Sequence, residues 1–182
     1  MSDPRYDLHT HSTASDGTQP PSEVVRSAQR AGLDGIALTD HDTTAGWAEA
    51  MHTARETGTL LVPGMEFTCR THEGISVHLL AYLPDPDDEA MVAETRRARA
   101  ARLERAQLMV ERLAEDFDIT WQRVLDHAGE DATIGRPHLA DALVAIGAVS
   151  DRSEAFAHIL TGSSKYYVPH NAPDPASYKQ LL

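Results

Sequence analysis

Histidines and carboxylates gather near the beginning of the chain at a spacing that suits a metal ion. His9 and His11 are separated by one residue, and side chains two apart on a strand point the same way. Asp16 follows in a loop where Gly17 lets the backbone turn, and His41 stands between two aspartates. Mixed imidazole and carboxylate ligands favour zinc, manganese or iron over calcium. Such a site can polarise a phosphoryl oxygen and activate a water molecule.

Each candidate ligand also has an ordinary structural explanation. A lone histidine on an apolar strand, such as His78, is more often a hydrogen-bonded core residue, and Asp16 alone suits a turn. Asp40 and Asp42, on either side of His41, could cap their loop or orient the imidazole from behind. The combination favours a metal site, because every candidate falls at or near the end of an expected strand. The candidates are His9, His11, Asp16, His41, Glu66 and His78.

The elements that would position these residues alternate between strands and helices. Apolar patterns predict short strands over residues 6–8, 35–39, 60–64 and 75–82. Glu66 is expected after the third strand and His78 on the fourth. One helix is expected from Pro21 to a stop at Gly32, and another from a cap at Thr43 or Thr44 to a stop at Gly58. This alternation predicts parallel βαβ units with right-handed crossovers.

The character of the chain changes over residues 83–89, where two prolines and four acids precede a helical stretch. One long helix is expected over 89–116, with an apolar stripe made of Leu103, Ala106, Val110 and Leu113. Shorter helices are expected over about 120–129, 137–146 and 151–161, followed by a loop to residue 175 and the start of a last helix.

The composition narrows the class of protein. A chain of 182 residues suits one domain, or one domain with an insertion. The formal net charge of −12 argues against binding of long nucleic acid, because it repels a phosphate backbone. A single cysteine, Cys69, excludes an internal disulfide and favours a cytoplasmic setting. No apolar run reaches the roughly 20 residues that span a bilayer, and no signal peptide is expected.

Three segments resemble the Polymerase and Histidinol Phosphatase (PHP) family of metal-dependent phosphoesterases. They are DLHTHSTASDG, GIALTDHDT and VPGMEFT, and the likeness covers residues 5–83. Their order is most similar to the branch that releases phosphate from nucleoside monophosphates and 3′,5′-bisphosphates, some members of which also trim RNA 5′ ends. The resemblance implies an α/β fold, a distorted seven-stranded (β/α) barrel that holds three metal ions, often manganese, with zinc or iron as alternatives.

The resemblance also implies a division of the chain and of the ligands. The expected parts are an N-terminal barrel portion over 1–83, an all-helical insertion that caps the substrate over 84–168, and a return toward the barrel over 169–182. Three sets of residues would each hold one metal ion: His9, His11 and Glu66; Asp16 and His41; and Glu66 with His78.

Phosphate-binding residues are expected in the segment IGRPHLA, residues 134–140, which resembles a substrate-binding segment of this branch. Pro137 suits the first turn of a helix whose free amides attract anions. Arg136 can grip phosphate with two hydrogen bonds and His138 can donate one, although an ordinary capped helix start with a surface arginine explains the pattern equally well. Further phosphate candidates are Lys165 and, more weakly, Arg99 and Arg102.

The family pattern also includes a later "AHP"-like histidine and an Asp-x-His pair, and neither occurs in the later part of this sequence. His170 comes too early and in a different context, so it receives no role. The chain is therefore expected to be part of a longer enzyme, or a shortened relative that folds with a partner. Such a part would lack ligands of all three metal ions.

The sequence thus predicts a phosphoesterase that acts on a small nucleotide, AMP or a 3′,5′-bisphosphonucleoside, with short RNA ends as a further partner. A metal-bound hydroxide would attack phosphorus in line. Two alternatives stay open. One is another metallohydrolase of the amidohydrolase type, which also begins with His-x-His but whose bridging lysine is not recognisable here. The other is a non-catalytic metal-binding module.

Overall fold

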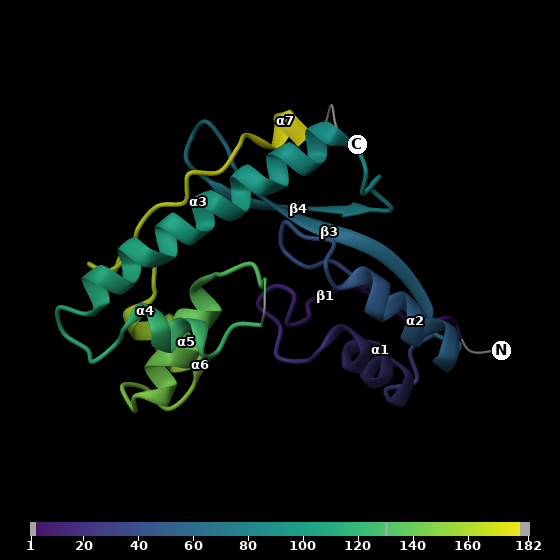
Figure 1. The fold of residues 1–182 in the computed structure, drawn as a ribbon, viewed down its shortest axis with the longest axis horizontal. Coiled ribbons are helices and arrows are strands. Elements are labelled where there is room, and N and C mark those ends of the chain that lie inside the picture. Colours follow the sequence, from purple (N-terminus) through teal and green to yellow (C-terminus); the bar gives the residue numbers. More distant parts are fainter. Residues whose placement is uncertain (1–2, 130, 179–182) are drawn as a thin grey trace.

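A four-stranded sheet forms the centre of the fold in the computed structural model, which describes residues 3–129 and 131–178 (Figure 1). The strands lie in chain order and are β1 (Tyr6–Thr10), β2 (Gly35–Leu38), β3 (Leu60–Arg70) and β4 (Ser76–Tyr82). The first three are parallel, as predicted, whereas β4 runs antiparallel to β3. The turn between β3 and β4 contains no helix, and a parallel pair would need a crossover of a dozen or more residues.

Strand β3 extends well beyond its expected end at residue 64. Its first half pairs with β2, and its second half, from Gly64 onward, pairs with β4. A side chain at Gly64 would meet the Thr39 methyl group at 2.8 Å, so glycine lets the chain pass close to the neighbouring loop. The prediction that Glu66 follows the third strand is therefore wrong, because Glu66 lies inside β3. In the β3–β4 pair, Thr68 lies opposite His78.

Two helices, α1 (Pro21–Arg30) and α2 (Trp47–Thr57), pack against each other and against β2 (Figure 1). The start at Pro21 and the stop at Gly58, which has a left-handed φ of 74°, are confirmed. The predicted threonine cap of α2 is wrong, because Thr43 instead accepts a hydrogen bond from the Ala45 amide in a turn before the helix. The Trp47 indole then donates to the Gly64 carbonyl at 2.9 Å and ties α2 to β3.

The described residues after β4 form helices and the segments that connect them. The helices are α3 (Glu89–Leu113), α4 (Trp121–Leu125), α5 (Arg136–Ala145), α6 (Arg152–Glu154), the π-helix η1 (Ala155–Ile159) and α7 (Pro175–Tyr178). The end of α3, α4, α5 and η1 share a hydrophobic cluster centred on Met109, Leu113, Leu139 and Leu143. This cluster is separate from the one formed by α1, α2 and β2.

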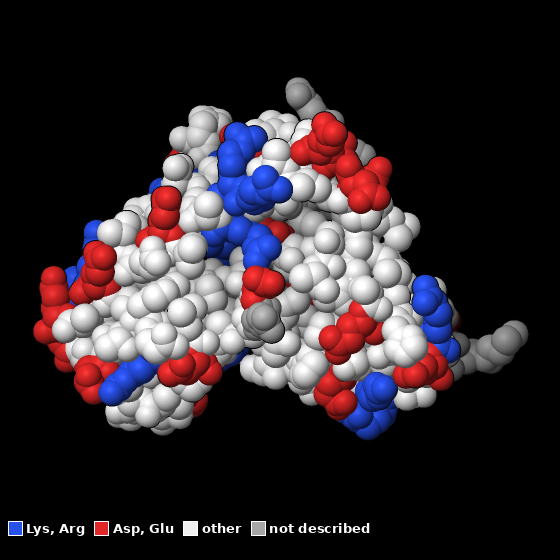
Figure 2. All heavy atoms as spheres, viewed as in Figure 1, with Lys and Arg blue, Asp and Glu red and all other residues white. Residues whose placement is uncertain are grey.

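Helix α3 crosses from the sheet to the helical group (Figure 1). Its expected apolar stripe is correct at Ala106, Val110 and Leu113, but Leu103 is 40% exposed and Arg102 is buried instead. Basic side chains gather over α3 on the face viewed in Figure 2, where acidic side chains are otherwise widespread. Within residues 3–129 and 131–178, no helix combines the length and the apolar character needed to cross a bilayer.

Candidate metal centre

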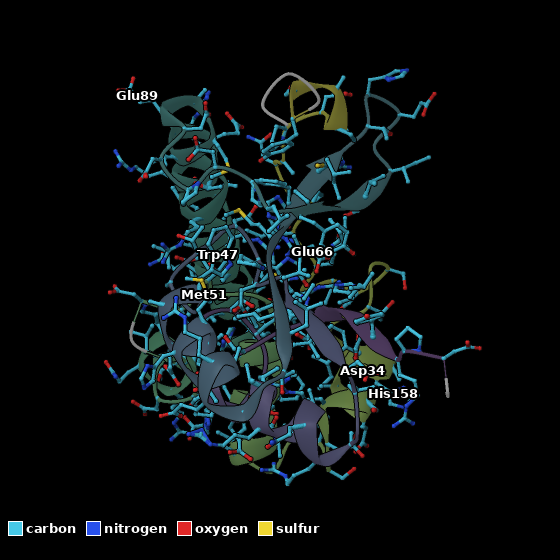
Figure 3. All side chains as sticks on the ribbon, turned by 90° about the vertical axis from the view of Figure 1, so that its right-hand side faces the viewer. Asp34, Trp47, Met51, Glu66, Glu89 and His158 are labelled. Atoms are coloured by element: carbon cyan, nitrogen blue, oxygen red, sulfur yellow. The ribbon has the colours of Figure 1, made fainter. Side chains whose placement is uncertain are left out.

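All six predicted ligands converge beside the carboxyl ends of β1 and β2. Strand β1 and the loop after it supply three of them, the loop after β2 and strand β3 supply one each, and β4 supplies the last. In order, these are His9, His11 and Asp16, then His41, Glu66 and His78. Figure 3 places Glu66 near the middle of the molecule, with Trp47 and Met51 of helix α2 to its left. Carboxyl ends of parallel strands commonly gather functional groups in this way.

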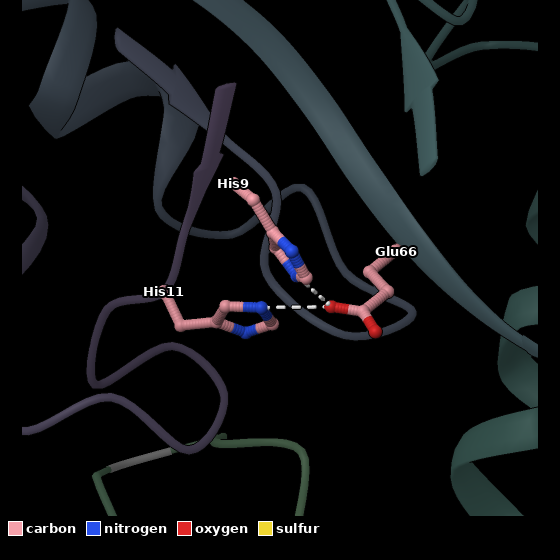
Figure 4. Close-up of side chains that lie close together, drawn as sticks. All are labelled: His9, His11 and Glu66. Atoms are coloured by element: carbon pink, nitrogen blue, oxygen red, sulfur yellow. Dashed lines mark hydrogen bonds and ion pairs between the residues drawn. The ribbon is translucent and has the colours of Figure 1, made fainter. Parts of the chain in front are cut away.

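Glu66 is the centre of the cluster. Its Oε2 atom lies 2.7 Å from His9 Nε2 and 2.8 Å from His11 Nε2 (Figure 4). Its other oxygen, Oε1, contacts His78 Nδ1. The Glu66 side chain is only 4% exposed, so its oxygens contact these imidazoles rather than bulk water. One buried carboxylate therefore faces imidazoles from two different strands.

A second set of contacts surrounds Asp16. Its Oδ1 lies 3.2 Å from His11 Nδ1, and its Oδ2 lies 3.6 Å from His41 Nε2. The other ring nitrogen of His41 is 3.9 Å from Glu66 Oε2 and has no hydrogen-bond partner among the described residues, although it is buried. A buried nitrogen without a partner is costly, and a metal ion would satisfy it.

The donor atoms fall into three groups, and within each group they lie within 4.8 Å of one another. These groups are His9, His11 and Glu66; His11, Asp16 and His41; and His41, Glu66 and His78. The six residues thus fit divalent metal ions in spacing and in donor type. The groups contain the three expected sets, with His11 and His41 each reaching a second group.

The charges of the cluster also suit a cation. Burial acts to raise the pKa of Glu66 and of Asp16, but their histidine partners hold both pKa values well below the usual range. Burial, together with the Arg102 charge, lowers the pKa of His41 to about 3, so this imidazole is neutral. For His11, burial is outweighed by Asp16 and Glu66, which raise its pKa to about 9. A cation that binds here would replace the His11 proton.

Asp40 acts on the cluster through a serine rather than directly. It accepts hydrogen bonds from the Ser12 amide at 2.7 Å and from the Ser15 hydroxyl at 2.6 Å. Ser15 Oγ lies 3.2 Å from His11 Nδ1 and, because its own proton goes to Asp40, it accepts from this imidazole. Asp40 therefore orients His11 through Ser15, and His11 Nε2 faces Glu66.

Asp42 has a different role from its neighbour. Its Oδ2 lies 2.9 Å from Arg102 Nε, and its Oδ1 accepts from the Thr68 amide at 3.4 Å. Arg102 also contacts the Thr68 hydroxyl, and its donors are committed to this buried pair rather than directed at a phosphate. No hydrogen bond joins Asp42 to an imidazole within the described chain. Arg102 lies one helical turn from Ala98 and from Ala106, which are also buried, so the three share one face of α3.

Within the described part of the chain, no hydrogen bond or ion pair joins Arg136 or His138 to the six ligands. Arg136 begins α5, donates to the Leu160 carbonyl at 3.1 Å and stacks on the Phe156 ring at 5.2 Å. His138 is buried and accepts from the Gly135 amide at 3.1 Å, so it carries its proton on Nε2. Burial lowers its pKa.

Lys165 forms an exposed ion pair with Asp116 at 2.5 Å, just beyond the end of α3. None of the contacts within the described residues joins it to the histidine cluster. Lys165 therefore ties the loop after η1 to the long helix in this structure.

Two arginines that the sequence did not single out, Arg105 and Arg152, join distant parts of the helical group, and Arg152 also reaches the loop of Asp16. Arg105 lies over the Tyr167 ring at 5.3 Å, and Arg136 lies 6.0 Å from the same ring. Arg152 binds both oxygens of Asp141 and donates to the Asp16 carbonyl at 3.2 Å, so it holds the ligand loop. Their partners are far apart in sequence, and no local pattern marks them.

The comparisons with known proteins agree with this geometry. The PHP domain family matches residues 7–134. The chain is 37% identical to a 5′-3′ exoribonuclease of Haemophilus influenzae and 35% identical to a 3′,5′-nucleoside bisphosphate phosphatase of Chromobacterium violaceum. Each alignment covers 90% of this chain, but only 59% and 58% of the respective relatives. The chain thus spans less than two thirds of the length of these relatives.

Two solved structures share the curled half-barrel sheet. A metal-dependent phosphoesterase from Bifidobacterium adolescentis is 46% identical, with a TM-score of 0.93 over 99% of this chain and 65% of its own. An amidohydrolase from Chromobacterium violaceum, solved with bound sulfate and no metal, is 32% identical, with a TM-score of 0.90 over 98% of this chain and 63% of its own. The matched family, the ligand spacing and these structures together show that the chain belongs to the PHP domain family.

Proposed function

We propose that this chain provides the metal-binding part of a phosphoesterase that releases phosphate from a small nucleotide, AMP or a 3′,5′-bisphosphonucleoside. The observation that carries the proposal is the arrangement of three imidazoles around the buried carboxylate of Glu66. Relatives named as a bisphosphate phosphatase, an exoribonuclease and a cyclic phosphate diphosphodiesterase all act on phosphoesters by their names.

The proposed ligand sets are those expected from the sequence: His9, His11 and Glu66; Asp16 and His41; and Glu66 with His78. Divalent ions held there, manganese in our proposal with zinc or iron as alternatives, would supply Lewis-acid activation of the phosphate and of water. The protein fixes the geometry, because Ser15 engages His11 Nδ1 and leaves Nε2 for the first set. Removal of a group that hydrogen-bonds to a metal-binding side chain commonly lowers metal affinity by about 10–100-fold.

The substrate phosphate is proposed to lie between the cluster and the start of α5. Arg136 and Arg105 share the Tyr167 ring, and their charges are close enough that Arg136 contributes, after burial, to lowering the pKa of Arg105 to about 10. Two cations held together in this way favour an anionic ligand. His138 would donate from Nε2, and Lys165 is the weakest member of the set because Asp116 occupies it. The sulfate bound by the Chromobacterium relative supports a site for a tetrahedral anion.

The helical residues 84–168 are proposed to act as a cap on the substrate. Their hydrophobic cluster is separate from that of α1, α2 and β2, which supports a division from residues 1–83 and 169–182. The Arg152 contact to the Asp16 carbonyl supports a position next to the site. The net charge of −12 favours a small nucleotide or a short RNA end over a long nucleic acid. The lone buried Cys69 supports a reducing, cytoplasmic setting.

The test is phosphate release from AMP and from 3′-phosphoadenosine 5′-phosphate by the full chain with manganese. His11→Ala should abolish release and reduce the bound metal, because it removes a ligand shared by two donor groups. His52→Ala is the matched control, since His52 is exposed on α2, where it pairs with Glu56, and belongs to none of the three donor groups. If the unaltered protein binds no metal, or if His11→Ala releases phosphate as fast as His52→Ala, the proposal is wrong.

A further inference from the structure

A cavity lies between α3, the loop after β2 and residues 132–134. Its volume is about 410 Å³, within the usual range for small-molecule sites. None of the six candidate metal ligands lines it. The cavity is therefore a separate feature, and basic residues of α3 form part of its lining.

Two arginines supply positive charge to this cavity. Arg96 and Arg99 both line it from α3, and within residues 3–129 and 131–178 neither forms an ion pair with a carboxylate. Arg99 uses one donor on the Asp131 carbonyl at 2.5 Å, which holds its guanidinium toward residues 132–134. Since a guanidinium has five N–H donors, most of its capacity remains for a ligand.

Thr133 contributes a buried hydroxyl to the lining of this cavity. Thr133 lines the cavity, is only 2% exposed, and its Oγ1 has no hydrogen-bond partner among the described residues. The backbone here is well anchored, since the Thr133 amide donates to the Ala14 carbonyl at 3.1 Å. An unpaired buried hydroxyl costs about 1–3 kcal/mol, so a ligand that bonds it recovers that energy.

Among the described residues, one carboxylate lines the cavity, and it does not oppose an anion. Asp42 forms part of the inner wall, but its charge is compensated by Arg102 at 2.9 Å. Thr43 and Thr44, which follow it in the loop, add hydroxyl groups to the same wall. The polar part of the cavity is thus cationic and rich in hydroxyl donors, a combination that suits phosphate oxygens.

The rest of the lining is apolar. Met65 and Met91 are buried in its floor, whereas Val92 and Leu103 are 36% and 40% exposed and have no cover. A ligand with only a phosphate group would leave these surfaces in water, so the cavity suits a molecule that also has an apolar or aromatic body. We propose that it binds a phosphorylated small molecule the size of a mononucleotide, at a site separate from the histidine cluster.

The probe for this site is AMP, titrated into the metal-free full chain by calorimetry. Arg96→Ala and Thr133→Val should each weaken AMP binding about tenfold or more, as expected for the loss of a hydrogen bond to a charged group. Arg97→Ala is the matched control, because Arg97 lies on the same turn but pairs with Glu94 and does not line the cavity. It should bind AMP as the unaltered protein does.

Thr133→Val also separates a ligand role from a structural one. It removes a hydroxyl that has no protein partner while keeping the shape, so its melting temperature without AMP should be unchanged or higher. Adenosine and inorganic phosphate should each bind more weakly than AMP. The proposal fails if metal-free protein binds no AMP, if Arg96→Ala and Arg97→Ala bind it equally, or if adenosine binds as tightly as AMP. These outcomes do not depend on phosphate release at the metal centre.

Discussion

The buried ion pair between Asp42 and Arg102 should be a principal link between the sheet and α3. Asp42 is 1% exposed and Arg102 is 7% exposed, and their atoms lie 2.9 Å apart. Arg102→Met keeps most of the side-chain length but leaves the carboxylate buried without its partner. Removal of one member of such a pair typically costs about 3–5 kcal/mol. For a chain of this size, that corresponds to a fall of roughly 6–20 °C in melting temperature.

The effect should depend on pH in a defined direction. Burial raises the pKa of Asp42 even with Arg102 beside it. A carboxyl whose folded pKa lies above its unfolded value favours folding at low pH, and this contribution is lost as the pH rises. Without Arg102 the folded pKa rises further, so the deficit of Arg102→Met should be largest at neutral pH and smaller at acidic pH.

Urea unfolding at pH 7 and pH 5 measures both effects. The double variant Asp42→Asn with Arg102→Met should be more stable at pH 7 than Arg102→Met alone, because the unpaired charge is gone. Asparagine also tolerates the left-handed φ of 52° at this position. Arg97→Ala, which breaks a pair whose arginine side chain is 74% exposed, should cost less than about 1 kcal/mol. The reasoning is refuted if Arg102→Met loses no more stability than Arg97→Ala, or if the double variant is the less stable one.

Three single contacts give further predictions. Ser15→Ala should lower metal affinity about 10–100-fold, because it removes the contact with His11. Chelator competition measures this affinity, and an unchanged value would contradict the role given to Ser15. His170 is buried with no partner for its ring among the described residues, and burial with nearby arginines lowers its pKa to about 3. The unfolded state therefore binds more protons below about pH 6.5, so stability falls on acidification. Between pH 7 and pH 5, the unaltered protein should lose about 2 kcal/mol more than His170→Leu, and equal losses would refute this. Gly64→Ala should cost about 1–3 kcal/mol because its methyl group meets the Thr39 side chain at 2.8 Å, whereas Gly162→Ala, with open space around it, should cost much less; similar melting temperatures would exclude the clash.

Local features of the site and fold were predictable because neighbouring residues determine them. The His-x-His spacing placed His9 and His11 on one strand end, and proline and glycine marked where α1 begins and α2 ends. These signals depend on backbone preferences within a few residues. Patterns of this kind also identified the α/β class and the helical second half of the chain.

Contacts between distant residues were decided only by the tertiary structure. The sequence by itself determined which residue types could bind a cation, but not that Glu66 lies inside β3, where it meets imidazoles from β1 and β4. Nor did it show that Arg102 is buried against Asp42, because a charged side chain enters a core only when a partner from another element compensates it. Pairing of this kind depends on how the strands and α3 pack, and no local preference encodes it.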